Sequence, residues 1–287
     1  MHIYCRGSGS PTVVMDAGLG DFSLTWDLVQ SEVAQHTRVC AYDRAGLGWS
    51  ERGPKPRTVK DIVEELHTLL SEGGIEGPYV LVGHSMGGVY VRAYAVQYPE
   101  EVVGMVLVDT AHEEQDLRTP TAFSQANAQV RAQMQQFLMV PRLVNSLGLL
   151  ASSPQDYPDE YLPPIPSGVK ETYKGVILSD TRYFSTVAEQ YAQLDGNMAE
   201  VRETGITTLG DIPLVVLSAS EPEIPESFGL SVEEADQVRA VWDEMQAELA
   251  ALSSRGERVI AEGSSHYVQF DQPELVIEAI RQVLEAE

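Results

Sequence analysis

Short apolar runs alternate along the chain with segments whose apolar residues recur at helical spacing. Residues 79–82 and 102–108 are almost continuously apolar, as is typical of parallel strands covered on both faces. The expected strands are residues 12–15, 38–42, 79–82, 102–108, 212–217 and 258–261. This alternation predicts an α/β fold with a mostly parallel central sheet and helices on both faces.

Helices are expected between these strands. Residues 24–35 form the first, and another begins at Thr58, where Asp61 stands three residues later as in a capping box. Ser231 and Glu234 repeat this pattern ahead of a long helix, and Pro273 opens the last one. The helical spacing of their apolar residues gives these helices a face that can pack on the sheet.

The alternation stops between residues 113 and 205. That stretch contains a helical pattern around residues 123–138 and a proline-punctuated segment at 154–166. We expect a helical cap inserted at 113–205 into a core domain formed by residues 1–112 and 206–287, over the sheet edge where such folds bind ligands. Its apolar underside is expected to comprise Phe123, Val130, Met134, Phe137, Leu138, Leu143, Leu147, Leu149 and Leu150.

A nucleophile is indicated by the segment Gly83-His84-Ser85-Met86-Gly87, which follows an apolar run and precedes a helical pattern. Strand, G-x-S-x-G, helix is the context of a nucleophile elbow. The glycines let the two backbones approach closely while Ser85 sits on a strained turn. The alternative is a strand-to-helix turn that happens to contain a serine.

A serine nucleophile requires a base, and a third group must orient that base. His266 follows the last expected strand in a glycine- and serine-containing loop and comes late in the chain, as the order serine, acid, histidine requires. Of the other histidines, His84 adjoins Ser85 and is expected to point away from it. The ones that fit less well are His2, His36, His67 and His112.

Two residues are candidates for the carboxylate that orients His266. Asp109 ends the strand that follows the elbow strand, from which a carboxylate can reach an imidazole. Glu221 lies in a proline-flanked loop after the next strand. Asp109 is preferred because it stands directly at a strand end, and Glu221 stays open as the alternative.

Oxyanion donors are expected at two backbone amides. One is Met86, immediately after the nucleophile, and the other is Leu19 in the glycine-containing loop after the first apolar strand. This loop lacks a full G-x-G-x-x-G and the lysine of a P-loop, which disfavours nucleotide binding. Asp43 and Arg44 begin a further loop, either shaping the floor of the site through hydrogen bonds or forming a solvated turn.

The net charge limits the classes of partner that the protein can bind, and the cysteine content bears on its redox compartment. The 287 residues carry 43 Asp and Glu against 19 Lys and Arg, a formal charge of −24. A surface this acidic argues against nucleic acid and anionic membranes as partners. Without an apolar span or a basic-then-apolar N-terminus, we expect a cytoplasmic protein. Cys5 and Cys40 are accordingly expected to be reduced core residues, and a disulfide between neighbouring strands is the alternative.

These residues together resemble the α/β-hydrolase fold superfamily, in its cap-bearing serine esterase-like branch. The resemblance rests on residues 83–87, 17–20, 43–50 and 263–266. It differs in lacking the usual aspartate after the penultimate strand, although some relatives place it where Asp109 stands. The N-terminus is also short, so the first edge strand is expected to be absent or trimmed.

The resemblance implies a serine hydrolase that acts on esters of small to medium hydrophobic substrates through an acyl-enzyme. Serine at position 85 argues against epoxide hydrolase or dehalogenase chemistry. No cofactor and no metal are expected, because no metal-ligand cluster occurs in the sequence. The alternatives are a carbon–carbon bond hydrolase with the same triad and a non-catalytic hydrolase-like protein that binds a ligand.

Overall fold

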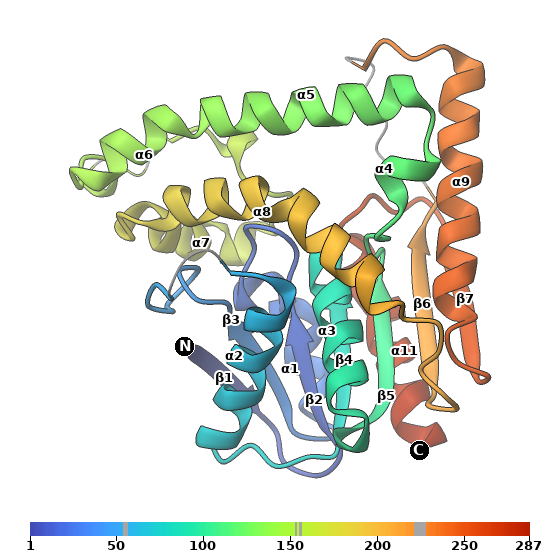
Figure 1. Cartoon of the computed structure of the whole chain (residues 1–287). Coiled ribbons are helices and arrows are strands. Elements are labelled where there is room, and N and C mark those ends of the chain that lie inside the picture. The colour runs from blue at the N-terminus through green and yellow to red at the C-terminus, as the bar shows by residue number, and fades with distance from the viewer. Residues whose placement is uncertain (54–56, 153, 155–156, 221–227) are drawn as a thin grey trace.

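The computed structural model describes residues 1–53, 57–152, 154, 157–220 and 228–287. These residues contain a seven-stranded sheet in the order β1-β3-β2-β4-β5-β6-β7, in which only β1, at one edge, runs antiparallel to its neighbour (Figure 1). The predicted fold class is therefore confirmed. The strands are β1 (His2–Arg6), β2 (Thr12–Asp16), β3 (Val39–Asp43), β4 (Tyr79–His84), β5 (Val102–Val108), β6 (Leu214–Ala219) and β7 (Gly256–Ala261).

Helices cover both faces of the sheet. The core of one face contains residues of α2 (Val59–Glu72), α3 (Met86–Gln97) and α9 (Val232–Ala250). That of the other contains α1 (Asp27–Val33) and α11 (Pro273–Ala286). Thr58 and Ser231 form the predicted capping boxes at α2 and α9. Shorter elements are η1 (Ser23–Trp26), η2 (Pro99–Glu101) and α10 (Val268–Asp271).

A helical insertion, defined here as residues 113–205, connects β5 to β6. It contains α4 (Gln115–Arg118), α5 (Thr121–Phe137), α6 (Met139–Ser146), η3 (Leu150–Ser152), η5 (Asp159–Tyr161), α7 (Ser167–Ser179) and α8 (Tyr183–Thr204). In Figure 1, α5 and α6 run across the top of the molecule, and α8 lies between them and the sheet. Within the described ranges, every helix is too short or too polar to cross a bilayer.

The prediction of an apolar underside is wrong for much of the insertion. Leu138 is buried, and Phe123 lines a cavity described below. The side chains that are exposed instead are Val130, Phe137, Leu143, Leu147 and Leu149. In α6 the buried residue is Asn145 and not an apolar one, and no described side chain of α5 is buried.

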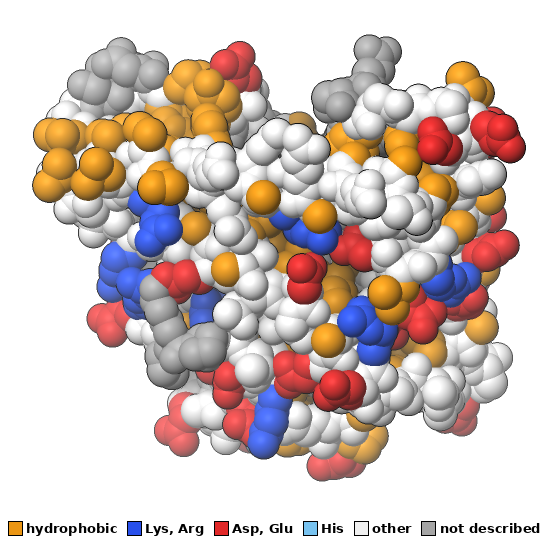
Figure 2. Space-filling model, turned by 45° about the horizontal axis from the view of Figure 1, so that its top comes forward, with side chains coloured by type: hydrophobic (Ala, Val, Ile, Leu, Met, Phe, Trp, Pro, Cys, Tyr) orange, Lys and Arg blue, Asp and Glu red, His pale blue; other side chains and the backbone are white. Residues whose placement is uncertain are grey.

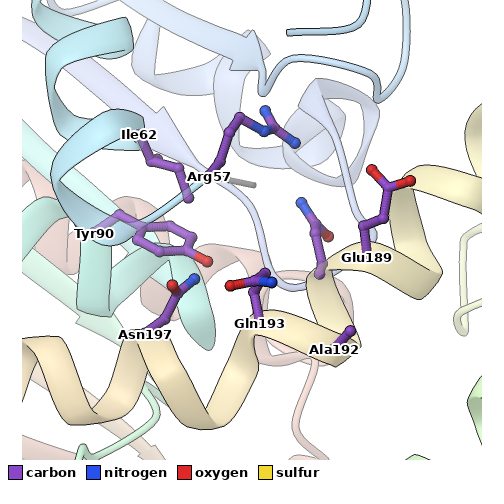
Figure 3. Close-up of a pocket in the computed structure, with 8 residues that line it drawn as sticks. Arg57, Ile62, Tyr90, Glu189, Ala192, Gln193 and Asn197 are labelled. Carbon is purple, nitrogen blue, oxygen red and sulfur yellow. The ribbon is translucent and has the colours of Figure 1, made fainter. Parts of the chain in front are cut away.

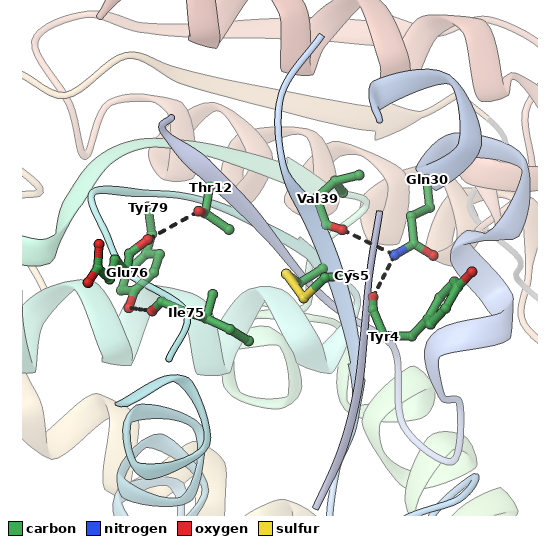
Figure 4. Close-up of a disulfide and its surroundings, with 9 residues drawn as sticks. Tyr4, Cys5, Thr12, Gln30, Val39, Ile75, Glu76 and Tyr79 are labelled. Carbon is green, nitrogen blue, oxygen red and sulfur yellow. Dashed lines mark hydrogen bonds between the residues drawn. A yellow bond between two sulfur atoms is a disulfide. The ribbon is translucent and has the colours of Figure 1, made fainter. Parts of the chain in front are cut away.

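The two cysteines form a disulfide, so the expectation that both are reduced is wrong (Figure 4). Register explains the bond, because Cys5 of β1 lies directly opposite Cys40 of β3 and their Cα atoms are 4.0 Å apart. Gln30 supports this edge, since its Nε2 donates to the carbonyl of Tyr4 at 2.8 Å (Figure 4). The disulfide thus ties the antiparallel edge strand to the parallel part of the sheet.

Candidate active site

Ser85 occupies the turn between β4 and α3 in a backbone conformation that L-residues rarely adopt, with φ 51° and ψ −120°. Only glycine fits at the two flanking positions, 83 and 87, for steric reasons. A Cβ at Gly83 would lie 2.5 Å from the Cα of Gly88, and one at Gly87 would lie 2.3 Å from the carbonyl oxygen of Asp16. The strand, turn and helix thus have the geometry of a nucleophile elbow, with Met86 as the first residue of α3.

His266 contacts Asp109 across the carboxyl ends of the strands. The His266 Nδ1 lies 2.6 Å from Oδ2 of Asp109, and the other carboxylate oxygen accepts a hydrogen bond from the Ala219 amide at 3.0 Å. Because a carboxylate only accepts, the imidazole proton lies on Nδ1, and Nε2 is the nitrogen that can take up a proton. The Asp109 side chain is buried, whereas that of His266 is 32% exposed.

One cavity of about 330 Å³ brings the predicted residues together. It is lined by all five residues chosen from the sequence: Leu19, Ser85, Met86, Asp109 and His266. The alternative acid, Glu221, lies outside the described residues. The cavity therefore contains an alcohol, an imidazole hydrogen-bonded to a carboxylate, and both residues whose amides were predicted as oxyanion donors.

His84 has a role in the site that the sequence reasoning missed. Its Nε2 donates to the backbone carbonyl of His266 at 2.9 Å. Burial lowers the pKa of His84 well below its usual value, and the charge of His266 acts in the same direction. A neutral imidazole therefore holds the backbone of the His266 loop, which lines the same cavity as Ser85.

The loop that carries Leu19 is fixed from beneath by Arg44. This buried guanidinium donates to the carboxylate of Asp16, to the carbonyl of Ala17 at 2.6 Å and to the carbonyl of Gly18. Its neighbour Asp43 accepts hydrogen bonds from the amides of Ser23 and Trp49. Both residues are buried, so the solvated-turn alternative is wrong and the hydrogen-bonding one is confirmed.

The same loop is also fixed from above, by residues of the insertion. Gln190 of α8 accepts a hydrogen bond from the Gly20 amide at 2.8 Å, and the hydroxyl of Tyr183 donates to the Gly20 carbonyl at 3.1 Å. Sequence patterns gave no signal for these contacts, because they depend on how α8 is rotated against the sheet. Leu19 thus precedes a glycine whose amide and carbonyl are both held by the insertion.

Asp21 is a buried carboxylate in this loop. Tyr173 of α7 donates its hydroxyl proton to Asp21 Oδ1 at 3.1 Å. Burial raises the pKa of Asp21 to about 6, although the Tyr173 hydrogen bond and the charge of Arg44 oppose the rise. Asp21 consequently titrates close to neutral pH, beside the predicted oxyanion donor.

Helix α8 separates two cavities. Tyr191, Leu194 and Met198 face the cavity of Ser85. One position earlier in each case, Gln190, Gln193 and Asn197 line a second cavity of about 240 Å³, together with Tyr90 of α3 and Arg57 (Figure 3). This second cavity is lined by none of the five residues predicted for catalysis, so the chemistry is assigned to the first. Among the described residues, no group of three or more His, Cys, Asp or Glu side chains has the arrangement of a metal site.

Comparisons with known proteins agree with this geometry. The sequence pattern of the "Alpha/beta hydrolase family" matches residues 13–279. The uncharacterized protein YqjL of Bacillus subtilis is 25% identical over 278 residues, which are 97% of this chain and 85% of that protein. A probable transporter of Hormonema carpetanum, efuK, is 27% identical over 98% of this chain, which spans only 40% of that protein.

Solved structures share the whole fold. An esterase from Thermogutta terrifontis superposes with a TM-score of 0.65 at 23% identity, covering 99% of this chain and 93% of the esterase. An epoxide hydrolase from Vigna radiata gives a TM-score of 0.70 at 15% identity, covering 100% and 94%. These likenesses at low identity concern the fold, and the chemistry has to be argued from the site itself.

Proposed function

This chain belongs to the alpha/beta hydrolase family, and we propose that it is a serine hydrolase that cleaves carboxylic esters through an acyl-enzyme intermediate. One observation carries the proposal: Ser85, on a strained elbow, lines the same cavity as His266, whose Nδ1 is hydrogen-bonded to Asp109. A serine hydroxyl is a weak nucleophile until a base accepts its proton, and a base held in one tautomer is suited to that task.

In the first half-reaction, Ser85 Oγ attacks the ester carbonyl carbon while His266 Nε2 takes the hydroxyl proton. Asp109 keeps the imidazole in the required tautomer and stabilises its positive charge. As the tetrahedral intermediate collapses, the bond to the alkoxy group breaks and His266 returns the proton to the leaving alcohol. The carbonyl oxygen, negative in the intermediate, is bound by the amides of Leu19 and Met86.

In the second half-reaction, water attacks the acyl-enzyme and His266 accepts its proton. The second tetrahedral intermediate expels Ser85, which regains its proton, and the carboxylic acid leaves. No cofactor and no metal takes part in either step, because the nucleophile, base and oxyanion donors all come from this chain.

Small to medium hydrophobic esters are the proposed substrates, and the insertion is the proposed cap over them. The cavity of about 330 Å³ sets the upper size. Much of its apolar lining comes from the insertion and from α9, and includes Phe123, Leu194, Met198, Val238 and Trp242. Gln115, Thr119 and Asn127 of the insertion also line the cavity, so we expect its apolar side chains to bind the hydrophobic part of the substrate and its shape to limit the acyl length.

Release of nitrophenol from a series of nitrophenyl esters of increasing acyl length tests this proposal. We expect turnover that declines for long acyl chains and is lost in Ser85→Ala. If carbon–carbon substrates are cleaved and esters are not, the reaction class is wrong. Tight binding of a hydrophobic ligand without turnover would mean that the site only binds.

A further inference from the structure

The free end of the insertion carries a large exposed apolar surface. Five aliphatic side chains from residues 139–149 are between 55% and 67% exposed: Met139, Val140, Leu143, Leu147 and Leu149. Phe137 and Tyr161 border them, with ring centroids 5.1 Å apart. We call these seven residues the α6 patch. Figure 2 shows hydrophobic side chains gathered at this end of the molecule, whereas most exposed apolar residues of a water-soluble surface stand singly.

Rotation of α6 about its axis cannot bury these apolar side chains, because the opposite face of the helix is held in place by a buried side chain. Asn145 is fully buried, and its Nδ2 donates to the carbonyl of Asp180 at 2.6 Å. Leu138, immediately before α6, packs in the core of the insertion. A buried amide and an exposed row of aliphatic side chains are the reverse of a helix that covers a hydrophobic core. The sequence thus fixes the apolar face outward.

Charge is distributed unevenly around this surface. All 43 Asp and Glu lie outside residues 117–155, a stretch that contains Arg118, Arg131 and Arg142. Arg131 pairs with Asp116 at 2.9 Å. Arg142, in the middle of α6, is exposed, and no ion pair involves it among the described residues. The rest of the chain therefore has 43 acidic against 16 basic residues, a formal charge of −27, whereas the patch is apolar and Arg142 lies between its residues on α6.

We propose that the α6 patch docks onto the surface of a lipid assembly, with the aliphatic side chains among the acyl chains and Arg142 at the headgroups. Exposed aliphatic residues beside a basic residue, on a short helix, are the composition of interfacial helices. Tyr161 and Phe137 at its border are residue types suited to the headgroup level. The acidic remainder of the molecule faces water, so the orientation is determined by charge as well as by hydrophobicity.

The whole-chain charge argued against anionic membranes, but residues 117–155, which include all of α6, contain no Asp or Glu. The exposed acidic residues next to the patch in sequence are Asp159 and Glu160, which precede Tyr161. A lipid surface is favoured over a second copy of the chain by the same charge distribution. Pairing through α6 would bring two copies of Arg142 together and two strongly acidic bodies near each other. A zwitterionic lipid surface imposes neither repulsion and needs no complementary groove. The proposal does not depend on the proposed hydrolysis, because its test measures binding.

Flotation of the full chain with vesicles tests it. Vesicles of phosphatidylcholine alone and with added phosphatidylglycerol are used, and we expect the protein to float with both and more completely with the second. The double variant Leu143→Ser/Leu147→Ser should lower the bound fraction about tenfold or more. Arg142→Gln should remove most of the gain due to phosphatidylglycerol, and leave binding to phosphatidylcholine alone unchanged.

Val232→Ser is the matched control, because Val232 is an exposed apolar residue of α9, outside the patch. It should bind vesicles like the unmodified chain, and all variants should keep the same melting temperature. Absence of flotation with either vesicle overturns the proposal. Equal flotation of the double serine variant and the unmodified chain also overturns it. A third contradicting result is that the unmodified chain binds no vesicles but forms a dimer in light scattering, and that the double serine variant is a monomer.

Discussion

His266 and Asp109 are 157 positions apart in the sequence, yet Nδ1 of one lies 2.6 Å from Oδ2 of the other. The carboxylate holds this position because its second oxygen accepts the Ala219 amide and because Asp109 adopts φ 39° at the end of β5. This pair makes Asp109 the proposed triad acid, one strand earlier than the usual position in the fold.

Asp109→Asn should lower kcat on a nitrophenyl ester by about four orders of magnitude, because the amide no longer holds His266 in the required tautomer. Glu221→Gln is the comparison, and it should stay near the unmodified rate. Steady-state kinetics of the two variants decide between them. A large loss in Glu221→Gln alone would move the acid to the later loop, and equal, mild losses in both would contradict the triad.

Gln190→Ala should lower kcat about tenfold with little change in KM, because the Gly20 amide loses its acceptor and the neighbouring Leu19 amide moves away from the oxyanion. Gln190→Glu keeps an acceptor oxygen and should recover most of the loss. Gln193→Ala is the control, since Gln193 lies on α8 and lines the second cavity. If Gln190→Ala and Gln193→Ala behave alike, the insertion does not position the oxyanion loop.

Asp21 should make stability fall as pH rises. Its pKa in the folded protein is about 6 against 3.8 in the unfolded chain, so the folded state binds more protons between these values. Ionised Asp21, facing Arg44, His266, Tyr173 and Tyr267, costs on the order of 3 kcal/mol at neutral pH. The stability gained by Asp21→Asn should therefore grow from pH 4 to pH 6 and then level off.

Chemical denaturation of the unmodified chain and Asp21→Asn at matched pH values measures this difference. Comparing the two proteins cancels the titration of the many other carboxylates. A difference that is constant with pH, or that increases toward acid, would show that Asp21 does not titrate in this range.

Reduction of the Cys5–Cys40 disulfide should destabilise the sheet edge by about 2–4 kcal/mol, given the loop of 35 residues that it closes. Thermal melts with and without a phosphine reductant measure this, and Cys5→Ser/Cys40→Ser should be insensitive to reductant. Alkylation and mass spectrometry on protein from its native compartment test the bond itself. The cytoplasmic location stays a prediction, and a disulfide is more typical of oxidising compartments.

The sequence was sufficient where chemistry follows directly from local pattern. Apolar runs located β4 and β5, and G-x-S-x-G located Ser85, because elbow geometry requires glycine at fixed positions. The disulfide was missed because the register of β1 on β3 is a tertiary property. The outward face of α6 was missed because a helical pattern shows that a face is apolar, and not what that face contacts.

Labelling with a fluorophosphonate probe tests the central claim most directly, because the probe bonds only to an activated serine. The account predicts a single adduct on Ser85, mapped by peptide mass spectrometry, that is absent in Ser85→Ala and formed far more slowly in His266→Ala. An adduct on another serine, or equal labelling of Ser85 with and without His266, would contradict it.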